Sequence, residues 1–218
     1  MDLNLIQKFS IWILPALFAI TVHEAAHGYA ARYFGDPTAA SLGRLSLNPL
    51  RHIDPIGTVL LPIATFFLSG FIFGWAKPVP VDARNLRNPR RDMAWVALAG
   101  PGSNLAMALF WALMMALAQW LAGMGMGEMA VPLALMGQAG VMINLLLMLF
   151  NLLPIPPLDG GRVLVSLLPP ALALPLARLE PFGLLILIAL LVSGVLWAVL
   201  GPILLGMNSF IINLLVHG

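Results

Sequence analysis

The sequence predicts an all-α protein that crosses a membrane several times. Hydrophobic residues make up 61% of the 218 residues and charged residues only 9%, whereas soluble domains carry about 25% charged residues. The apolar residues gather into long stretches, and a helix needs about 20 of them to cross a bilayer. The net charge is only +2, which gives no support to a nucleic-acid partner. These observations predict a polytopic helical bundle whose partner is the lipid bilayer.

Five strong apolar segments and a shorter tail follow one another along the chain. They cover residues 9–31, 56–75, 93–121, 131–153 and 181–200, and the tail covers 202–216. Asp54 and Pro55 indicate the start of the second segment, and Asp92 is a candidate cap for the third. The tail is short for a crossing, so the sequence does not decide whether it spans. The length suits one integral-membrane domain over residues 1–218.

The charges between the segments predict how the chain is oriented. Basic residues gather in loops 32–55, 76–92 and 154–180. Loop 122–130 carries Glu128 and no base, so the positive-inside rule makes it external and the three basic loops cytoplasmic. Segment 56–75 is then flanked by basic loops on both sides. We expect it to be re-entrant, which is tolerated where protein or a water-filled cavity satisfies its backbone; the alternative is a plain crossing helix.

The first apolar segment contains the pentapeptide His23-Glu24-Ala25-Ala26-His27. Two histidines four residues apart lie on one face of a helix, so both imidazoles can reach one metal ion. Glu24 lies beside that ion and can handle the proton of a bound water. Ionisable groups at bilayer depth cost roughly 2.5–3.5 kcal/mol each on insertion scales, so their presence there indicates function.

The third metal ligand is expected from Asp159. The first crossing runs inward, which places the histidines in the cytoplasmic half, and the fourth segment ends there with the run Asn151–Gly161. Prolines in this run break the helix, and Gly160-Gly161 lets a short helix begin close by. A carboxylate completes a His2Asp set and leaves a fourth position for water, as a catalytic zinc requires. We expect Asp159 to cap a helix over 160–168 as well as to bind the metal; the alternative is that it only caps this helix.

Three motifs resemble those of the site-2 protease family of intramembrane zinc metalloproteases. They are HEAAH in an apolar helix, Gly100-Pro-Gly-Ser-Asn104 in a third segment, and Asn-x-x-Pro-x-x-Pro-x-Asp-Gly at the end of a fourth. The resemblance covers a catalytic core of about residues 10–170 and leaves C-terminal helices at about 181–216 outside it. It is to the minimal bacterial or archaeal members, which lack a PDZ or CBS domain.

The resemblance implies roles for individual residues. It implies one Zn2+ held by His23, His27 and Asp159, with Glu24 as catalytic acid and base. It also suggests that Asn151 and Asn104 face the active site. For Asn151 the alternative to stabilising an oxyanion is a helix–helix hydrogen bond. For Asn104 we favour packing between helices, where small residues such as Gly100 allow close approach; Asn144 is expected to bond between helices too.

The resemblance further implies hydrolysis of peptide bonds within or near transmembrane helices of membrane-protein substrates. Residues 73–81 resemble a membrane-associated β-hairpin beside the substrate, to which an extended substrate could add as a strand; the alternative is a simple interfacial loop. The expected location is a bacterial or archaeal cell membrane, with the active site in its cytoplasmic half. Two rival functions are a zinc transporter or channel, which also uses intramembrane His and Asp, and a catalytically idle protein that binds membrane helices. The oligomeric state is not predicted.

Overall fold

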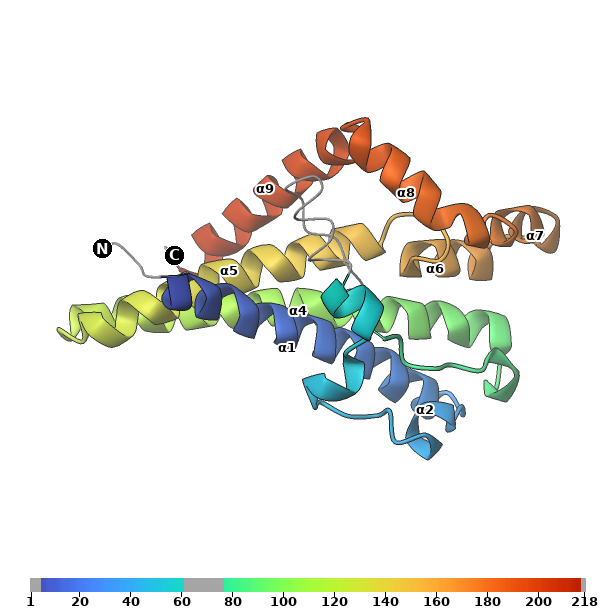
Figure 1. The fold of residues 1–218 in the computed structure, drawn as a ribbon, viewed down its shortest axis with the longest axis horizontal. Helices are drawn as coiled ribbons and strands as arrows, with labels where there is room; N and C mark the ends of the chain where they lie inside the picture. Colours follow the sequence, from blue (N-terminus) through green and yellow to red (C-terminus); the bar gives the residue numbers. More distant parts are fainter. Residues whose placement is uncertain (1–4, 61–76, 217–218) are drawn as a thin grey trace.

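The computed structural model describes residues 5–60 and 77–216, and every regular element in these two ranges is helical. Three long helices, α1 (Leu5–Tyr33), α4 (Pro89–Gly123) and α5 (Gly127–Asn151), lie side by side along the longest axis (Figure 1). The other helices are α2 (Thr38–Ser41), α6 (Asp159–Leu167), α7 (Pro170–Ala177), α8 (Gly183–Val192) and α9 (Val195–Leu215). Short helical turns are η1 (Pro49–His52), η2 (Pro55–Leu60), η3 (Ala83–Asn85) and η4 (Glu180–Phe182). The predicted all-α fold class is confirmed.

Within the described ranges, five helical stretches are long and apolar enough to cross a membrane. They are Phe9–Tyr33, Pro89–Gly123, Gly127–Asn151, Pro170–Val192 and Val195–Leu215. The first three contain or largely overlap the predicted segments 9–31, 93–121 and 131–153. The polytopic membrane architecture that the composition predicts therefore has its helices in the expected places over the first three crossings.

The prediction for the C-terminal part is wrong in one respect. The apolar run 181–200 is not one helix, because the chain turns between α8 and α9 at Gly194, whose φ is +76°. Glycine adopts this left-handed conformation without the steric cost that a side chain brings, and hydropathy does not register it. The tail 202–216 belongs almost entirely to the 21-residue helix α9, which is long enough to span. Figure 1 shows α8 and α9 meeting at an angle above α5.

Segment 56–75 is described only at its start. The carboxylate of Asp54 accepts hydrogen bonds from the backbone N–H groups of Ile56 (3.0 Å) and Gly57 (2.7 Å). Residues 55–60 then form one π-helical turn, so the predicted cap is confirmed. The remainder, residues 61–75, lies outside the described residues, and the re-entrant path stays a prediction.

The short β-hairpin expected near 73–81 is not found in its described part. Residues 77–81 are irregular, and residues 73–76 lie outside the described ranges. Pro78 and Pro80 have no N–H to donate to a ladder, and the N–H of Val79 donates to a side chain on α1 instead. Alternating prolines therefore work against strand pairing on this edge of the segment.

The interface between α4 and α5 depends on small residues. A Cβ at Gly140 would lie 2.2 Å from the ring of Trp111, so the indole packs directly on the α5 backbone. Around this contact lies a buried cluster to which α9 contributes Leu204 and Ile211. At the start of α4, Asp92 is not the cap that the sequence suggests; its carboxylate accepts the backbone N–H of Asn88 from inside the first turn, at 2.7 Å.

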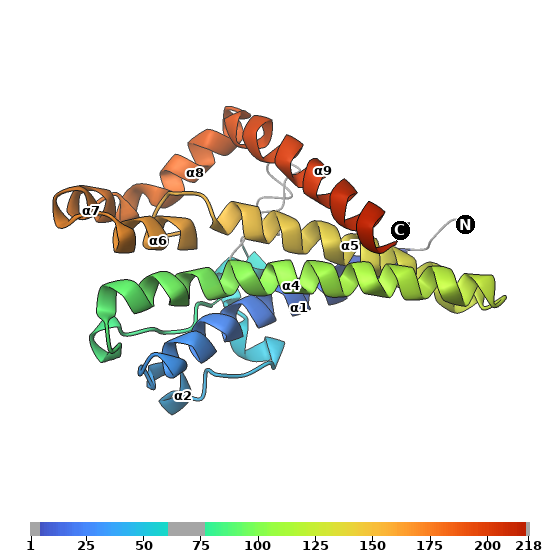
Figure 2. The ribbon, with the colours of Figure 1, turned by 180° about the vertical axis from the view of Figure 1, so that it is seen from behind.

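The ends of the bundle differ in composition. In the view of Figure 1 and in the view from behind, Figure 2, the α4–α5 turn lies at the same end as the start of α1 and the end of α9. Helices α2, α6 and α7 and the start of α4 lie toward the other end. The loops with the basic residues belong to this second end, as a common cytoplasmic location would require.

Candidate metal centre and its pocket

Three buried side chains, two from α1 and one from the first residue of α6, converge on one point. The Nε2 atoms of His23 and His27 lie 3.1 Å apart, and each lies 3.3 Å from Oδ2 of Asp159. Among the described residues this is the one group of three such side chains able to share a metal ion. The structure thus brings together the three residues that the sequence nominates as ligands.

The spacing of these three atoms fits a tetrahedral metal ion. Zinc–ligand bonds of 2.0–2.1 Å put neighbouring corners of a tetrahedron about 3.3 Å apart, and the three observed separations are 3.1, 3.3 and 3.3 Å. Oδ2 of Asp159 is buried and contacts no donor of the described residues except the two imidazoles. A buried carboxylate oxygen of this kind calls for a positive partner. The donor set therefore fits one divalent ion with a fourth position left for water.

Helix α4 sets the position of both imidazoles. A Cβ at Gly100 would lie 2.4 Å from Nε2 of His27 and 2.6 Å from Cε1 of His23, so both rings rest on the bare α4 backbone. Nδ1 of His27 donates to the carbonyl of Val96 at 2.8 Å, and Nδ1 of His23 lies 2.6 Å from Oδ1 of Asn104. Each ring thus turns its Nε2 toward the common point.

Two glycines bring Asp159 to the histidines. A Cβ at Gly160 would lie 2.2 Å from the carbonyl oxygen of Leu152, and one at Gly161 would lie 2.3 Å from the nitrogen of Pro156. The short helix expected after the proline-rich break is confirmed, folded tightly against that break. Asp159 is itself the first residue of α6, and no side chain caps this helix. The expected cap role of Asp159 is therefore wrong, and its carboxylate faces the imidazoles instead.

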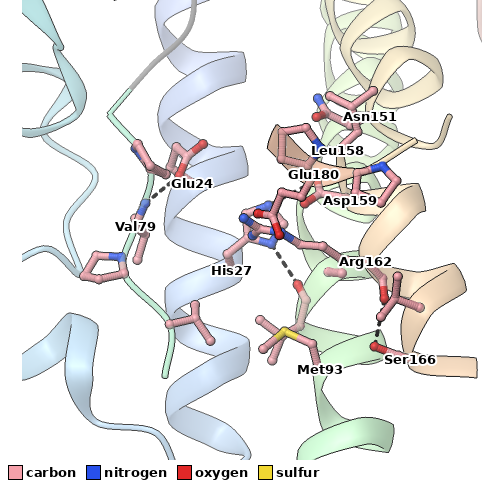
Figure 3. Close-up of a pocket in the computed structure, with 18 of the residues that line it drawn as sticks. Glu24, His27, Val79, Met93, Asn151, Leu158, Asp159, Arg162, Ser166 and Glu180 are labelled. Atoms are coloured by element: carbon pink, nitrogen blue, oxygen red, sulfur yellow. Dashed lines mark hydrogen bonds and ion pairs between the residues drawn. The ribbon is translucent and has the colours of Figure 1, made fainter. Parts of the chain in front are cut away.

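Glu24 lies on the same helix, next to the histidine pair. Its Oε2 accepts the backbone N–H of Val79 at 2.8 Å, so the irregular stretch 77–81 is attached to the candidate base (Figure 3). Val79 is buried, and its side chain packs on α1, where a Cβ at Gly28 would lie 3.0 Å from it. Sequence reasoning missed this contact, because a backbone donor leaves no mark in the residue pattern.

A cavity of about 700 Å3 opens on this group. Its walls combine residues 78–81, apolar side chains of α4 and α6 such as Met93 and Val165, and the charged Arg162 and Glu180 (Figure 3). Asn151 also lines it, although its amide nitrogen donates to the carbonyl of Leu147 in its own helix at 3.0 Å. The metal position and Glu24 therefore both border this cavity.

Asn104 and Asn144 lie behind the histidines and do not line the cavity. The expected helix–helix bond is present: Nδ2 of Asn104 donates to Oδ1 of Asn144 at 3.0 Å. The contact of Asn104 with His23 was not predicted. The signal for it was in the sequence, because Gly100 and Asn104 have the same four-residue spacing as His23 and His27 and therefore share one helix face.

Comparison with known proteins identifies the family. The model of Peptidase family M50 matches residues 128–194, which include Asp159. The protein named "Putative zinc metalloprotease YwhC" of Bacillus subtilis (strain 168) is 38% identical over 192 residues, covering 86% of this chain and 84% of its own. Proteins named "Putative zinc metalloprotease Rip2" are 30% identical in Mycolicibacterium smegmatis (88% of this chain, 70% of theirs) and 33% identical in Mycobacterium tuberculosis strain H37Rv (85% and 68%). No solved structure matches. The chain belongs to peptidase family M50, the site-2 protease family that its motifs resemble.

Proposed function

We propose that this protein is an intramembrane zinc metalloprotease that cleaves membrane-protein substrates within or near their transmembrane helices. The observation that carries the proposal is the meeting of His23, His27 and Asp159 at a cavity between apolar, membrane-length helices. The relatives' names, which refer to zinc metalloproteases, agree with it. We assign the whole chain, residues 1–218, to one membrane domain with this single site.

The three converging side chains would hold the zinc ion. When bound, the ion would polarise the scissile carbonyl and lower the pKa of its water to about 7. His23 and His27 contribute their Nε2 atoms, because their Nδ1 atoms already bond to α4. Asp159 contributes Oδ2, which lies within reach of both imidazoles.

Glu24 acts as the general base and then as the general acid. The N–H of Val79 occupies Oε2, which leaves Oε1 to take the proton of the attacking water. Glu24 then delivers this proton to the departing amine. Asn151 keeps a second amide N–H beyond the one given to Leu147, and we assign it to the oxyanion that develops on the cleaved carbonyl.

The substrate must present an extended stretch, because the carbonyls of a helix are already hydrogen-bonded. Residues 78–81 form one wall of the cavity beside Glu24, and we propose that an extended peptide lies along this wall. Arg44 donates to the carbonyls of Lys77 (3.1 Å) and Pro78 (3.5 Å) and so holds this wall in place. With the basic loops at the same end, we place the site in the cytoplasmic half of a bacterial or archaeal cell membrane.

The test is the isosteric substitution Glu24→Gln in protein purified in detergent and reconstituted with single-pass membrane substrates. Glu24→Gln should slow hydrolysis by at least 10²-fold, because a general base contributes at least this factor to the rate. The variant should still bind one zinc ion per chain. Glu128→Gln, at the far end of the bundle, is the matched control and should cleave at the wild-type rate.

Two outcomes would overturn the proposal. Wild-type protein that binds no zinc would remove the metal site. Zinc flux across vesicles that persists in Glu24→Gln, without hydrolysis by the wild type, would identify a transporter instead, since transport needs ligands but no base.

A further inference from the structure

A line of buried polar groups leads away from the candidate metal site through three helices. Nδ1 of His23 on α1 lies 2.6 Å from Oδ1 of Asn104 on α4. Nδ2 of Asn104 donates to Oδ1 of Asn144 on α5 at 3.0 Å, and Nδ2 of Asn144 donates to the carbonyl of Gly140 at 2.8 Å. Both asparagines are fully buried. In a membrane bundle no water replaces such bonds, so each group depends on the next.

Two backbone carbonyls, Gly140 at the end of this line and Ala19 beside Asn104, fix the direction of its hydrogen bonds. A carbonyl oxygen only accepts, so Gly140 requires the NH2 group of Asn144 and turns its Oδ1 toward Asn104. That oxygen and the carbonyl of Ala19, at 3.3 Å, both require the NH2 group of Asn104. The Oδ1 of Asn104 is therefore left for His23.

The donor-to-acceptor direction of these hydrogen bonds decides the tautomer of His23. Since Oδ1 of Asn104 only accepts, Nδ1 of His23 must carry the hydrogen. Nε2 then presents its lone pair toward Nε2 of His27 and Oδ2 of Asp159. The opposite tautomer would put a hydrogen where a metal ligand needs a lone pair.

The second histidine is held in a different way. Nδ1 of His27 donates to the backbone carbonyl of Val96, which no side-chain substitution removes. Only the tautomer of His23 depends on side chains. The side chains of Asn104 and Asn144 come within reach because glycines let the helices approach closely. Gly100 stands one turn before Asn104, and Gly140 stands one turn before Asn144.

We propose that Asn104 and Asn144 are positioning residues that act as one relay and set His23 in the tautomer that binds metal. The inference rests on the zinc site of the proposed function and adds the residues that prepare it. Partners that orient metal-ligating histidines are worth about 10- to 100-fold in metal affinity. Asn144, which touches no ligand, matters because its Oδ1, at 3.0 Å, is the nearer of the two acceptors that hold the amide of Asn104 in this orientation; the carbonyl of Ala19 lies at 3.3 Å.

The test measures zinc affinity of the purified full-length protein by competition with a chromophoric chelator. Asn104→Ala and Asn144→Ala should each weaken zinc binding by about 10- to 100-fold. Asn104→Leu, which keeps about the same volume but makes no hydrogen bond, should weaken zinc binding as Asn104→Ala does. Ser103→Ala is the matched control, since its hydroxyl bonds to the carbonyl of Gly100 in the same helix, and it should bind as the wild type does.

A second measurement reads the tautomer without metal or substrate. In zinc-free protein with 15N-labelled histidine, at a pH that keeps the imidazole neutral, the ring shifts of His23 should report Nδ1–H in the wild type. In Asn144→Ala they should move toward Nε2–H. The spectrum of His23→Gln, in which the signals of this ring are absent, assigns them.

The outcomes separate this inference from the function on which it rests. Wild-type protein that binds no zinc contradicts the proposed function. Wild-type protein that binds zinc while both alanine variants bind it equally well overturns the relay. Asn104→Leu binding zinc as tightly as the wild type also overturns it, because that result would assign the effect to packing alone. If Asn104→Ala does not fold, Asn144→Ala provides the test through its zinc affinity and the ring shifts of His23. Asn144 lies on α5, one helix further from the ligand His23.

Discussion

Gly100 decides how closely α4 approaches the two histidines of α1. Gly100→Ala places a methyl group 2.4 Å from Nε2 of His27 and 2.6 Å from Cε1 of His23, so both rings must shift from their places. We expect zinc binding and peptidase activity to be lost, with overpacking costing about 1–3 kcal/mol of stability. Zinc content and cleavage rate of the purified variant check this.

Gly102, two residues after Gly100 on α4, provides the control. A Cβ at Gly102 meets nothing within 4 Å, so Gly102→Ala should keep zinc and activity. Equal behaviour of the two variants would show that the close approach of α4 to the histidine rings has no consequence.

Outside the membrane-length helices, Asp36 is a single residue on which we expect the stability of the fold to depend. It is buried and accepts hydrogen bonds from Thr38, from the side chain of Asn85 (3.0 Å) and from the backbone of Asp82 (2.7 Å). Burial alone would raise the pKa of this carboxyl, but the hydrogen bonds outweigh burial and lower the pKa below its ordinary value.

This lowered pKa predicts a pH dependence of stability. A carboxyl whose pKa is lower in the folded state stabilises the fold above its unfolded pKa of about 3.9, and the benefit fades as the pH falls through the folded pKa. Asp36→Asn should therefore reduce the Tm at neutral pH and flatten its decline below about pH 4. Thermal unfolding in detergent between acid and neutral pH measures both. A wild-type slope in the variant would contradict the assignment.

At the scale of elements, the irregular stretch 77–81 lies where the sequence suggested part of a β-hairpin. It borders the cavity, but its one central N–H is given to Glu24 by Val79. Val79→Pro removes this donor, and hydrogen bonds to charged groups are worth about 1.5–3 kcal/mol. We therefore expect cleavage to slow by about 10- to 100-fold with zinc content unchanged.

Val79→Ala separates the hydrogen bond from packing, because it trims the buried side chain and keeps the N–H. It should retain most of the activity. An equal loss in both variants would assign the effect to packing of the stretch on α1, and full activity of Val79→Pro would show that Glu24 needs no such donor.

The elements also show what residue patterns convey and what they omit. The histidine pair, the proline break and the glycines after Asp159 each act through local geometry, so their spacing predicted how they fold. The turn at Gly194 and the contact between Val79 and Glu24 depend on a backbone angle and a backbone donor. Neither the backbone angle nor the backbone donor can be derived from hydropathy or from the identity of the side chains. The direction of the Asn104 amide likewise depends on carbonyls of two other helices.

On the scale of the whole molecule, charge asymmetry along the bundle predicts its orientation. The chain contains no cysteine, so single cysteines report location against a silent background. Glu128→Cys, after the α4–α5 turn, should react with a membrane-impermeant maleimide on intact cells. Arg84→Cys, in the basic connection before α4, should react only after permeabilisation. The reverse pattern would put the candidate active site in the outer half of the membrane.

The two histidines belong to α1, whereas Asp159 belongs to α6, which follows α4 and α5 along the chain. Because ribosomes make a chain from its N-terminal side, both imidazoles are synthesised before the carboxylate of Asp159 exists. The candidate metal site is therefore complete only late in biogenesis, once α6 has packed against α4.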